Sequence, residues 1–398
     1  MQAVILAAGK GTRMYPLTVS RPKPLIEVAN KPVLEHNLEQ MLGLIEEAII
    51  IVGYKKDQII NRFGDNYKGL KIKYVIQEKQ LGTGHAVLTA EKLIQNKFLV
   101  LNGDDLFSRK DMLNLSKYDN CILVKYKEDP SAFGAVVVEK GLVKDIVEKS
   151  KKVISHLVNT GMYSFSPEVF EILKKIEPSV RGEYELTDAV KVLAKEGKMH
   201  YEEVQGYWIP VGYPWHILEA TEKLLEEKEE VSIKGKLGRK VVIEGSLDLG
   251  EGSLIEDGCV LKGNIVIGKG CFIGENSELS GFTAIGDGTR IGEKVKLINT
   301  IIGAGCELED NCEVKDSVLG DKVRLSSGVK ISNLGKYNSS KFNLGKSSSD
   351  QSNPKETIKV NSKGKEYDSG RERLGAFVGD KCVVCKKLHP GECVEKDC

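Results

Sequence analysis

The chain has 398 residues, too many for one ordinary compact core, so two domains are the first expectation. Hydrophobic residues make up 41% of it, which is enough for folded domains. The 58 Lys and Arg residues nearly balance the 57 Asp and Glu residues, leaving a net charge of +1. This balance excludes a general electrostatic attraction to nucleic acid or to an anionic membrane, so neither is an expected partner.

The apolar run at residues 3–8 is too short for a signal-peptide core or a membrane-spanning helix. We therefore expect a soluble, cytoplasmic protein. The nine cysteines are mostly isolated and do not form the framework of a small secreted domain, so reduced thiols are expected.

Residues 1–230 alternate short apolar runs with helical patterns, and we assign them to one domain. Residues 3–6, 48–52, 72–76 and 98–101 predict buried strands, residues 33–44 and 84–93 predict helices, and a charged helix at 214–230 ends the domain. This alternation predicts an α/β fold with a mixed, mostly parallel sheet covered on both faces. Ligands bind such sheets at the carboxyl ends of the strands.

The second half of the chain has a different period. An apolar residue recurs every six positions from Ile243 to Leu297, and the pattern continues after one-residue shifts from Ile302 and from Leu319 to Ile331. A helix has no such period, and the strands of a β-sandwich would alternate every second residue. The hexapeptide repeat therefore predicts a parallel β-helix over residues 236–334. Residues 335–373 are expected to form a polar loop, and residues 374–398 a short return to the β-helix or a Cys-rich tail.

The strongest local motif follows the first predicted strand and reads LAAGKGTRM over residues 6–14. Backbone N–H groups near Gly9 and Gly11 can wrap phosphate oxygens, so Leu6, Ala7 and Ala8 with the two glycines are candidate nucleotide-binding residues. The motif is neither a Walker A loop nor a dinucleotide fingerprint. Glycine turns alone are structural about as often as functional, but Arg13 and Lys23 add two cations beside this phosphate-binding loop.

A second motif, QEKQLGTGHAV, covers residues 77–87 between a predicted strand and helix. Gln77 can present both a donor and an acceptor to a base edge, and Gly82 allows the backbone to approach the ring. Thr83 joins them as a nucleotide-binding candidate, although a simple helix N-cap at Thr83 is the alternative. His85 is assigned to helix packing.

A third motif, VLNGDD at residues 100–105, ends a predicted strand in carboxylates. Mg²⁺ prefers oxygen ligands and commonly uses few protein carboxylates together with phosphates, so Asp104 is the candidate metal ligand. Gly103 is assigned to nucleotide binding. Asp105 is expected at the surface or in a cap.

Together these motifs resemble those of the sugar-1-phosphate nucleotidyltransferase family, whose signature combines G-x-G-T-R, P-L-T and P-K-P, here residues 9–13, 16–18 and 22–24. The resemblance is to members of the N-acetylglucosamine-1-phosphate uridylyltransferase or glucose-1-phosphate thymidylyltransferase type. It implies a Rossmann-like nucleotidyltransferase domain followed by a left-handed β-helix, with three hexapeptides in each coil. It also implies that Arg13 assists the departure of pyrophosphate and that Lys23 holds phosphate groups.

The same resemblance implies a sugar site. Gly134, Glu148, Asn159 and Thr187 would contact sugar hydroxyls or an N-acetyl group, and Lys149 would lie near the sugar phosphate. Each of them alone could equally be a surface residue.

The implied reaction transfers a nucleotidyl group from UTP to N-acetylglucosamine 1-phosphate with Mg²⁺, releasing pyrophosphate and forming a nucleotide sugar. A homo-oligomer, specifically a trimer, is implied as well. One alternative is a glucose-1-phosphate thymidylyl- or uridylyltransferase. Another is a non-catalytic regulatory subunit, which Pro210 favours because it stands where the family has a second metal ligand.

The β-helix is not expected to acetylate glucosamine 1-phosphate, although bifunctional relatives do so. Asp310 and Glu313 stand where those relatives have a His and a Tyr, and a carboxylate is a weaker base than an imidazole. At the tail, a zinc site is one hypothesis, formed by Cys382, Cys385, His389, Cys393 and Cys398.

Overall fold

The computed structural model describes residues 1–148, 152–226, 228–334 and 357–397. These residues divide into two compact units, each described separately below. The first unit comprises Met1–Lys10, Arg21–Leu25 and Pro32–Pro210, and the second comprises Gly11–Ser20, Ile26–Lys31 and Val211–Cys398. In the described ranges, no helix has the length and apolar character needed to cross a membrane. Part of the expected polar loop, residues 335–356, lies outside the described residues.

The first unit is built on a ten-stranded sheet in the order β10-β11-β13-β9-β12-β7-β1-β4-β6-β5. The strands β7, β1, β4 and β6 are parallel neighbours, as the alternating pattern predicts. Beyond β7 the sheet becomes mixed, because β12 pairs antiparallel with both β7 and β9 while β13 pairs parallel with β9. The strands are β1 (Gln2–Ala7), β4 (Glu47–Val52), β5 (Asn66–Tyr67), β6 (Leu70–Ile76), β7 (Phe98–Asn102), β9 (Cys121–Tyr126), β10 (Gly134–Glu139), β11 (Leu142–Glu148), β12 (Leu157–Phe165) and β13 (His200–Glu203).

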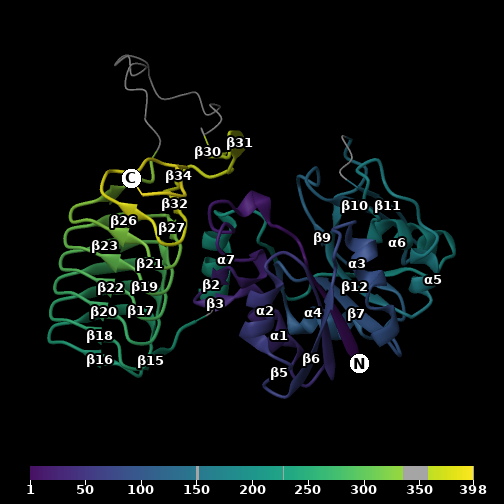
Figure 1. Ribbon diagram of the computed structural model, residues 1–398, viewed down its shortest axis with the longest axis horizontal. Helices are drawn as coiled ribbons and strands as arrows, with labels where there is room; N and C mark the ends of the chain where they lie inside the picture. The colour runs from purple at the N-terminus through teal and green to yellow at the C-terminus, as the bar shows by residue number, and fades with distance from the viewer. Residues whose placement is uncertain (149–151, 227, 335–356, 398) are drawn as a thin grey trace, which may run out of the picture. The chain divides into compact units, whose positions relative to one another are not determined.

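Helices cover both faces of this sheet (Figure 1). Residues of α1, α2 and α4 pack with Ile5 of β1 on one face, and residues of α3, α5 and α6 pack with Val4 on the other. Neighbouring residues of β1 therefore point to opposite cores, as a strand buried on both faces requires. The helices are α1 (Val33–Met41), α2 (Lys56–Phe63), α3 (Thr83–Leu88), α4 (Arg109–Leu115), α5 (Val169–Leu173) and α6 (Leu186–Lys195), and a small antiparallel pair joins β8 (Asp105–Phe107) to β14 (Trp208–Pro210).

The second unit consists mainly of parallel coils, which Figure 1 shows as a stack beginning at β15 and β16. Strand partners in successive coils stand 18 residues apart at first, as at Val242 and Val260, which equals three hexapeptides. The spacing then falls to 17, as at Ile302 and Leu319. Its strands are β15 (Val231–Ile233), β16 (Lys236–Leu237), β17 (Val242–Leu249), β18 (Leu254–Ile255), β19 (Val260–Ile267), β20 (Phe272–Ile273), β21 (Glu278–Ile285), β22 (Arg290–Ile291), β23 (Lys296–Ile298), β24 (Ile301–Ile302), β25 (Glu307–Leu308), β26 (Glu313–Lys315), β27 (Val318–Leu319), β28 (Arg324–Leu325) and β29 (Lys330–Ile331).

The hexapeptide positions form the core of these coils. Every repeat residue from Leu249 to Ile331 is buried, and Ile243 packs against the same cluster. The change of spacing occurs at one corner, where Gly281 of one coil is followed by Asn299 and Asp316 in the next two, all with positive φ. Asn299 Nδ2 donates to Asp316 Oδ1 at 3.1 Å, and Asn333 Nδ2 donates to Asp316 Oδ2 at 2.6 Å. The one-residue shifts in the repeat therefore arise because this corner of the coil is one residue shorter, and amide and carboxylate side chains hold the shortened corner.

The C-terminal residues rejoin the coils after the polar insertion. β32 (Phe377–Val378) pairs with β27, β33 (Val383–Val384) pairs with β28, and β34 (Cys393–Val394) pairs with β32. A hairpin of β30 (Lys359–Ser362) and β31 (Lys365–Asp368) precedes them. The helix expected at 214–230 is the shorter α7 (His216–Leu225), and it belongs to the second unit, where Asn264 Nδ2 donates to the carbonyl of Leu225 at 2.6 Å.

Candidate active site

The end of β1 is held by the strands beside it. The carbonyl of Ala8 accepts hydrogen bonds from the Tyr54 N–H at 3.1 Å and from Gln80 Nε2 at 2.6 Å, and the Gly103 N–H donates to the carbonyl of Leu6 at 2.9 Å. A Cβ at Gly103 would lie 2.9 Å from Ile5 Cγ2, so only glycine allows this approach. Residues 6–8 therefore have a fixed position at the carboxyl edge of the sheet, where ligands bind in folds of this kind. Gln80 was not identified from the sequence, since its role depends on a contact distant in sequence.

Lys23 and Asp104 form an ion pair at this edge. Lys23 begins the short 3₁₀ helix Lys23–Leu25, and Asp104 lies between β7 and β8. Lys23 Nζ lies 2.5 Å from Asp104 Oδ2, and the two side chains are 8% and 36% exposed. A nearly buried ammonium beside a partly exposed carboxylate can bind both phosphate oxygens and a hard cation.

A cavity of about 490 Å³ opens at the carboxyl ends of β1, β4 and β6. Its lining residues all belong to the first unit, and they are Lys10, Gly53, Tyr54, Lys56, Ile76, Gln77, Glu78 and Gln80. Two lysines, an aromatic ring and amide groups can accommodate a charged ligand with a planar base. Tyr54 and Lys56 were not singled out from the sequence, because they follow β4 without any recognisable motif.

The segment 77–83 is fixed by contacts with residues far along the chain. Gln77 is buried, and its Nε2 donates to the carbonyl of Gly82 at 3.1 Å and lies 3.0 Å from His85 Nδ1. Gly82 has a φ of 107°, and a Cβ there would lie 2.6 Å from the carbonyl oxygen of Tyr184. The alternative interpretation of Thr83 as the helix N-cap is wrong, because Gly82 is the N-cap and Thr83 Oγ1 instead accepts from the Leu186 N–H at 3.0 Å.

Three of the five expected sugar-binding residues lie together. Gly134 of β10 is paired with Glu148 of β11, and a Cβ at Gly134 would lie 3.0 Å from Glu148 Oε1 and 3.6 Å from the Asn159 Cβ. Asn159 Nδ2 donates to the Tyr163 hydroxyl at 2.7 Å. Burial raises the pKa of Tyr163, with Glu148 and Glu185 adding to the effect, so its hydroxyl stays protonated. Tyr163 was not identified from the sequence.

Of the other two expected sugar-binding residues, the structure describes Thr187 but not Lys149. Thr187 is buried in α6, and its Oγ1 has no hydrogen-bond partner among the described residues. A buried hydroxyl without a partner is costly unless a ligand or water satisfies it. Lys149 lies outside the described residues.

Pro210 and Asp105 are opposite each other in the β14–β8 pair. Asp105 directly follows the candidate metal ligand Asp104. The strand partner of Asp105, Pro210, is therefore close to Asp104 in register, but its side chain offers no oxygen ligand. The prediction that Asp105 is a surface or capping residue is wrong, because it is only 9% exposed and its Oδ2 accepts from Trp208 Nε1 at 3.2 Å. A buried indole N–H needs such an acceptor.

Arg13 belongs to the second unit, in the segment Gly11–Ser20. Gly11 has a φ of 61°, the left-handed conformation that favours glycine, and begins the short helix Thr12–Met14. The Arg13 guanidinium lies over the ring of Tyr213, 5.1 Å from its centroid. This cation–π contact fixes the side chain without consuming its N–H donors.

The cysteine-rich tail does not gather a metal site in the part of the chain that is described, which lacks any group of three His, Cys, Asp or Glu able to hold a metal. Cys382 is buried in the coil core and Cys385 is exposed, with its Sγ 3.3 Å from Ser326 Oγ. Alternate residues of a coil point in and out, which separates the thiols. The zinc hypothesis is therefore wrong for these residues, and Cys398 lies outside the described residues.

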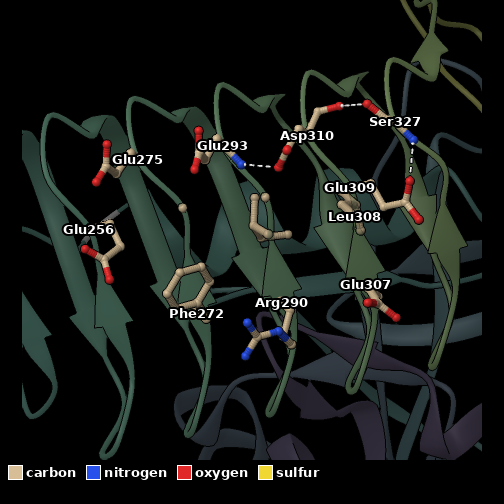
Figure 2. A pocket seen from close by; sticks show the side chains of 13 residues that line it. Glu256, Phe272, Glu275, Arg290, Glu293, Glu307, Leu308, Glu309, Asp310 and Ser327 are labelled. Atoms are coloured by element: carbon tan, nitrogen blue, oxygen red, sulfur yellow. Dashed lines mark hydrogen bonds between the residues drawn. The ribbon is translucent and has the colours of Figure 1, made fainter.

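The coils carry a hollow of their own, about 570 Å³ in volume (Figure 2). Its charged lining residues are Glu256, Glu275, Arg290, Glu293, Glu307, Glu309 and Asp310. The Asp310 carboxylate accepts from the Glu293 N–H at 2.8 Å, and the Glu309 carboxylate accepts from the Ser327 N–H at 2.8 Å. These two carboxylates therefore hold turns of neighbouring coils together, and the hollow is strongly acidic.

Comparisons with known proteins identify the family of this chain and support its fold. A sequence model of the nucleotidyl transferase family matches residues 2–227, which is more than half of the chain. The chain belongs to the nucleotidyl transferase family. A model of the GMPPB C-terminal domain matches residues 243–336, which include most of the coils.

Relatives in the nucleotidyl transferase family are named for sugar-phosphate chemistry. The bifunctional protein GlmU of Methanococcus maripaludis is 45% identical over 263 residues, which cover 64% of this chain and 62% of that relative, so the match spans less than two thirds of the relative. The bifunctional sugar-1-phosphate nucleotidylyltransferase/acetyltransferase of Sulfurisphaera tokodaii is 31% identical over 100% of this chain and 98% of its own. A crystal structure of UDP-glucose pyrophosphorylase complexed with UDP-glucose has a TM-score of 0.52 and 27% identity, covering 57% of this chain and 99% of that one.

Proposed function

We propose that this protein transfers a nucleotidyl group from UTP to N-acetylglucosamine 1-phosphate and releases pyrophosphate. The observation that carries the proposal is the Lys23–Asp104 pair at 2.5 Å, which lies at the carboxyl edge of the parallel strands in a member of the nucleotidyl transferase family. A cation and a carboxylate at this edge suit two phosphorylated substrates. The cavity lined by Lys10 and Gln77 at the same edge is the proposed nucleotide pocket.

The reaction needs no protein nucleophile. An oxygen of the sugar phosphate attacks the α-phosphorus in line, a new P–O bond forms, and the bond from the α-phosphorus to the bridging oxygen breaks to release pyrophosphate. We propose that Lys23 neutralises charge on the reacting phosphates and that Arg13 assists the departure of pyrophosphate. Backbone N–H groups of Gly9, Gly11 and Gly103 would orient the nucleotide phosphates.

Asp104 is the proposed Mg²⁺ ligand. Its partly exposed carboxylate fits an ion that is bound through few protein oxygens together with substrate phosphates. The bound ion would supply positive charge to the phosphate oxygens. Pro210 gives no second ligand in its pair with Asp105, so we propose that phosphates and water complete the coordination.

The residues that would recognise the base and the sugar are also proposed. Gln77, Gly82 and Thr83 would bind the uracil base, and buried Gln77 is held in a fixed orientation for this purpose. The sugar would contact Gly134, Glu148, Asn159 and the Thr187 hydroxyl, whose lack of a partner among the described residues supports a ligand there. Lys149 is proposed near the sugar phosphate.

The domain bounds, the handedness of the coils and the oligomeric state are proposed as well. We infer that residues 1–230 and 236–334 act as a nucleotidyltransferase domain and a β-helix domain, and that residues 374–398 are a short return to the coils. The expected polar loop at 335–373 contains the β30–β31 hairpin in its described part. The coils would wind left-handed, and the chain would form a trimer. Spacings of 18 and 17 residues between strand partners suit such coils.

Glucose 1-phosphate is the second candidate acceptor, because the fold is similar to that of UDP-glucose pyrophosphorylase. A matrix of UTP and dTTP against N-acetylglucosamine 1-phosphate and glucose 1-phosphate separates the candidates when kcat/KM is measured by pyrophosphate release. The proposal expects the highest value for UTP with N-acetylglucosamine 1-phosphate. A higher value for glucose 1-phosphate would replace the acceptor, and no release with any pair would contradict nucleotidyl transfer.

Acetyl transfer to glucosamine 1-phosphate is not expected. Asp310 holds a coil turn through the Glu293 N–H, and the surrounding hollow has many carboxylates that would repel the phosphates of acetyl-CoA. The test incubates the protein with acetyl-CoA and glucosamine 1-phosphate and follows free thiol, with the protein's own cysteines blocked. Thiol release that depends on the amino sugar would contradict this expectation.

A further inference from the structure

The loop that carries Arg13, residues 11–20, has little regular structure of its own. It contains the short helix Thr12–Met14 and an internal hydrogen bond from Thr18 Oγ1 to the carbonyl of Gly11 at 3.0 Å. Met14 is buried, whereas Arg13 is exposed. A loop of this kind keeps a precise geometry only when other segments hold it. Those segments come from the C-terminal part of the same unit.

Tyr15 is held by two such residues. Its hydroxyl donates to Glu395 Oε2 at 2.6 Å, and Lys363 Nζ lies 4.7 Å from the centroid of its ring. Burial raises the pKa of Tyr15, and the hydrogen bond to Glu395 raises it further, so the hydroxyl remains a donor. Glu395 directly follows β34, which pairs with β32 in the last coil. The middle of the Arg13 loop is thus tied to the last coil.

Ser20 ties the C-terminal end of the loop to the same coil. Its hydroxyl donates to Asp380 Oδ2, while Asp380 Oδ1 accepts from the Asp321 N–H at 2.7 Å. Asp380 therefore holds a coil turn with one oxygen and the Arg13 loop with the other. Between Tyr15 and Ser20, a Cβ at Gly379 would lie 3.4 Å from the Pro16 Cβ, so the backbone of this coil packs directly against the loop.

Arg13 itself reaches the last coil through aromatic rings. Its guanidinium lies over Tyr213, whose ring stacks on Trp215 with centroids 4.5 Å apart and an interplanar angle of 8°. Trp215 in turn meets Phe377 of β32 at 6.3 Å, and Tyr213 meets Tyr367 of β31 at 5.3 Å. The orientation of the guanidinium therefore depends on rings that the C-terminal residues pack against.

We propose that the last coil positions Arg13 for nucleotidyl transfer, with Asp380 and Glu395 as positioning residues. This inference rests on the proposed function, in which Arg13 assists the departure of pyrophosphate. An arginine that acts only when charge develops on the leaving group contributes to kcat, and it must be held before the reaction to do so. Loosening its loop lowers kcat while the KM of the sugar phosphate stays the same.

The test compares the full-length protein with the double variant Tyr15→Phe/Ser20→Ala. This variant removes both hydroxyl donors and leaves Asp380 and Glu395 in their coil. We expect kcat to fall about fivefold to thirtyfold, because two hydrogen bonds to charged acceptors are lost and one of them is exposed to solvent. Glu395→Gln retains an acceptor for Tyr15 and is expected to keep kcat within about twofold.

Tyr118→Phe is the matched control, since the Tyr118 hydroxyl donates to Glu202 at 2.8 Å in the first unit and is not part of the candidate site. Hydrogen–deuterium exchange of residues 11–20, measured without substrate, gives a readout independent of activity. Faster exchange in this segment together with a lower kcat in the double variant supports the inference. Normal kcat in the double variant overturns it while the proposed function stands, whereas an inactive wild-type protein overturns the proposed function first.

Discussion

Replacement of Lys23 by Met tests the site because it separates catalysis from stability. Met retains most of the length of the side chain but removes the ammonium that lies 2.5 Å from Asp104 Oδ2. With side-chain exposures of 8% and 36%, the pair is intermediate between a surface and a buried salt bridge. Removing the cation should therefore lower the free energy of unfolding by about 1–3 kcal/mol.

The expected loss of activity is larger. If Lys23 neutralises charge on the reacting phosphates, its removal should lower kcat by at least about a hundredfold, which corresponds to ~2.7 kcal/mol of transition-state stabilisation. Asp104→Asn should have an effect of similar size, because it removes the carboxylate proposed to bind Mg²⁺. Both variants are expected to remain folded, since each substitution is made at the ligand-binding edge of the sheet.

The assay measures pyrophosphate release, with circular dichroism and denaturant unfolding on the same samples. Lys68→Met is the matched control, because Lys68 Nζ also pairs with a carboxylate, Glu39 Oε1 at 2.7 Å, but on an exposed surface. It should leave kcat unchanged. Turnover near the wild-type rate in a folded Lys23→Met variant would refute the assignment of this edge as the reaction centre.

Three further predictions address other parts of the molecule. Gly82→Ala should raise the KM for UTP at least about tenfold and destabilise the protein by ~2–4 kcal/mol, because the added Cβ would lie 2.6 Å from the Tyr184 carbonyl oxygen. Steady-state kinetics and denaturant unfolding check this prediction. An unchanged KM would mean that the segment does not bind UTP. Pro210→Asp should lower the Mg²⁺ concentration for half-maximal rate by adding an oxygen ligand, and an unchanged Mg²⁺ titration would show that this position does not face the ion. Light scattering of the full chain should give three times the mass of one chain, and a monomer mass would contradict the trimer.

The sequence predicted the regular parts of the fold well, because they depend on local periodicity. The strands expected at 3–6, 48–52, 72–76 and 98–101 correspond to β1, β4, β6 and β7, each within two residues at its ends. β6 is only partly buried, however, and Ile76 at its end is exposed. Every hexapeptide position from Leu249 to Ile331 is buried, and the one-residue shifts mark the corner at Asn299 and Asp316. The place of α7 in the second unit could not be predicted, because amphipathic periodicity indicates a helix but not its partner.

Predictions for the site were weaker where a side chain's role depends on distant partners. Asp105 was expected at the surface, but the indole of Trp208, far along the chain, makes it a buried acceptor. Thr83 has the residue type of an N-cap, yet its hydroxyl accepts from Leu186 instead. The spacing of the tail cysteines suited zinc, but the alternation of the coil directs Cys382 inward and leaves Cys385 exposed.

Phosphorus NMR of the wild-type protein with UTP, N-acetylglucosamine 1-phosphate and Mg²⁺ tests the central claim most directly. We expect the signals of both substrates to decline together, while one pyrophosphate and one new diphosphate linkage appear for each pair consumed. Omitting the sugar phosphate should stop the reaction. Orthophosphate as the product, or unchanged substrate signals over many hours at high protein concentration, would contradict nucleotidyl transfer.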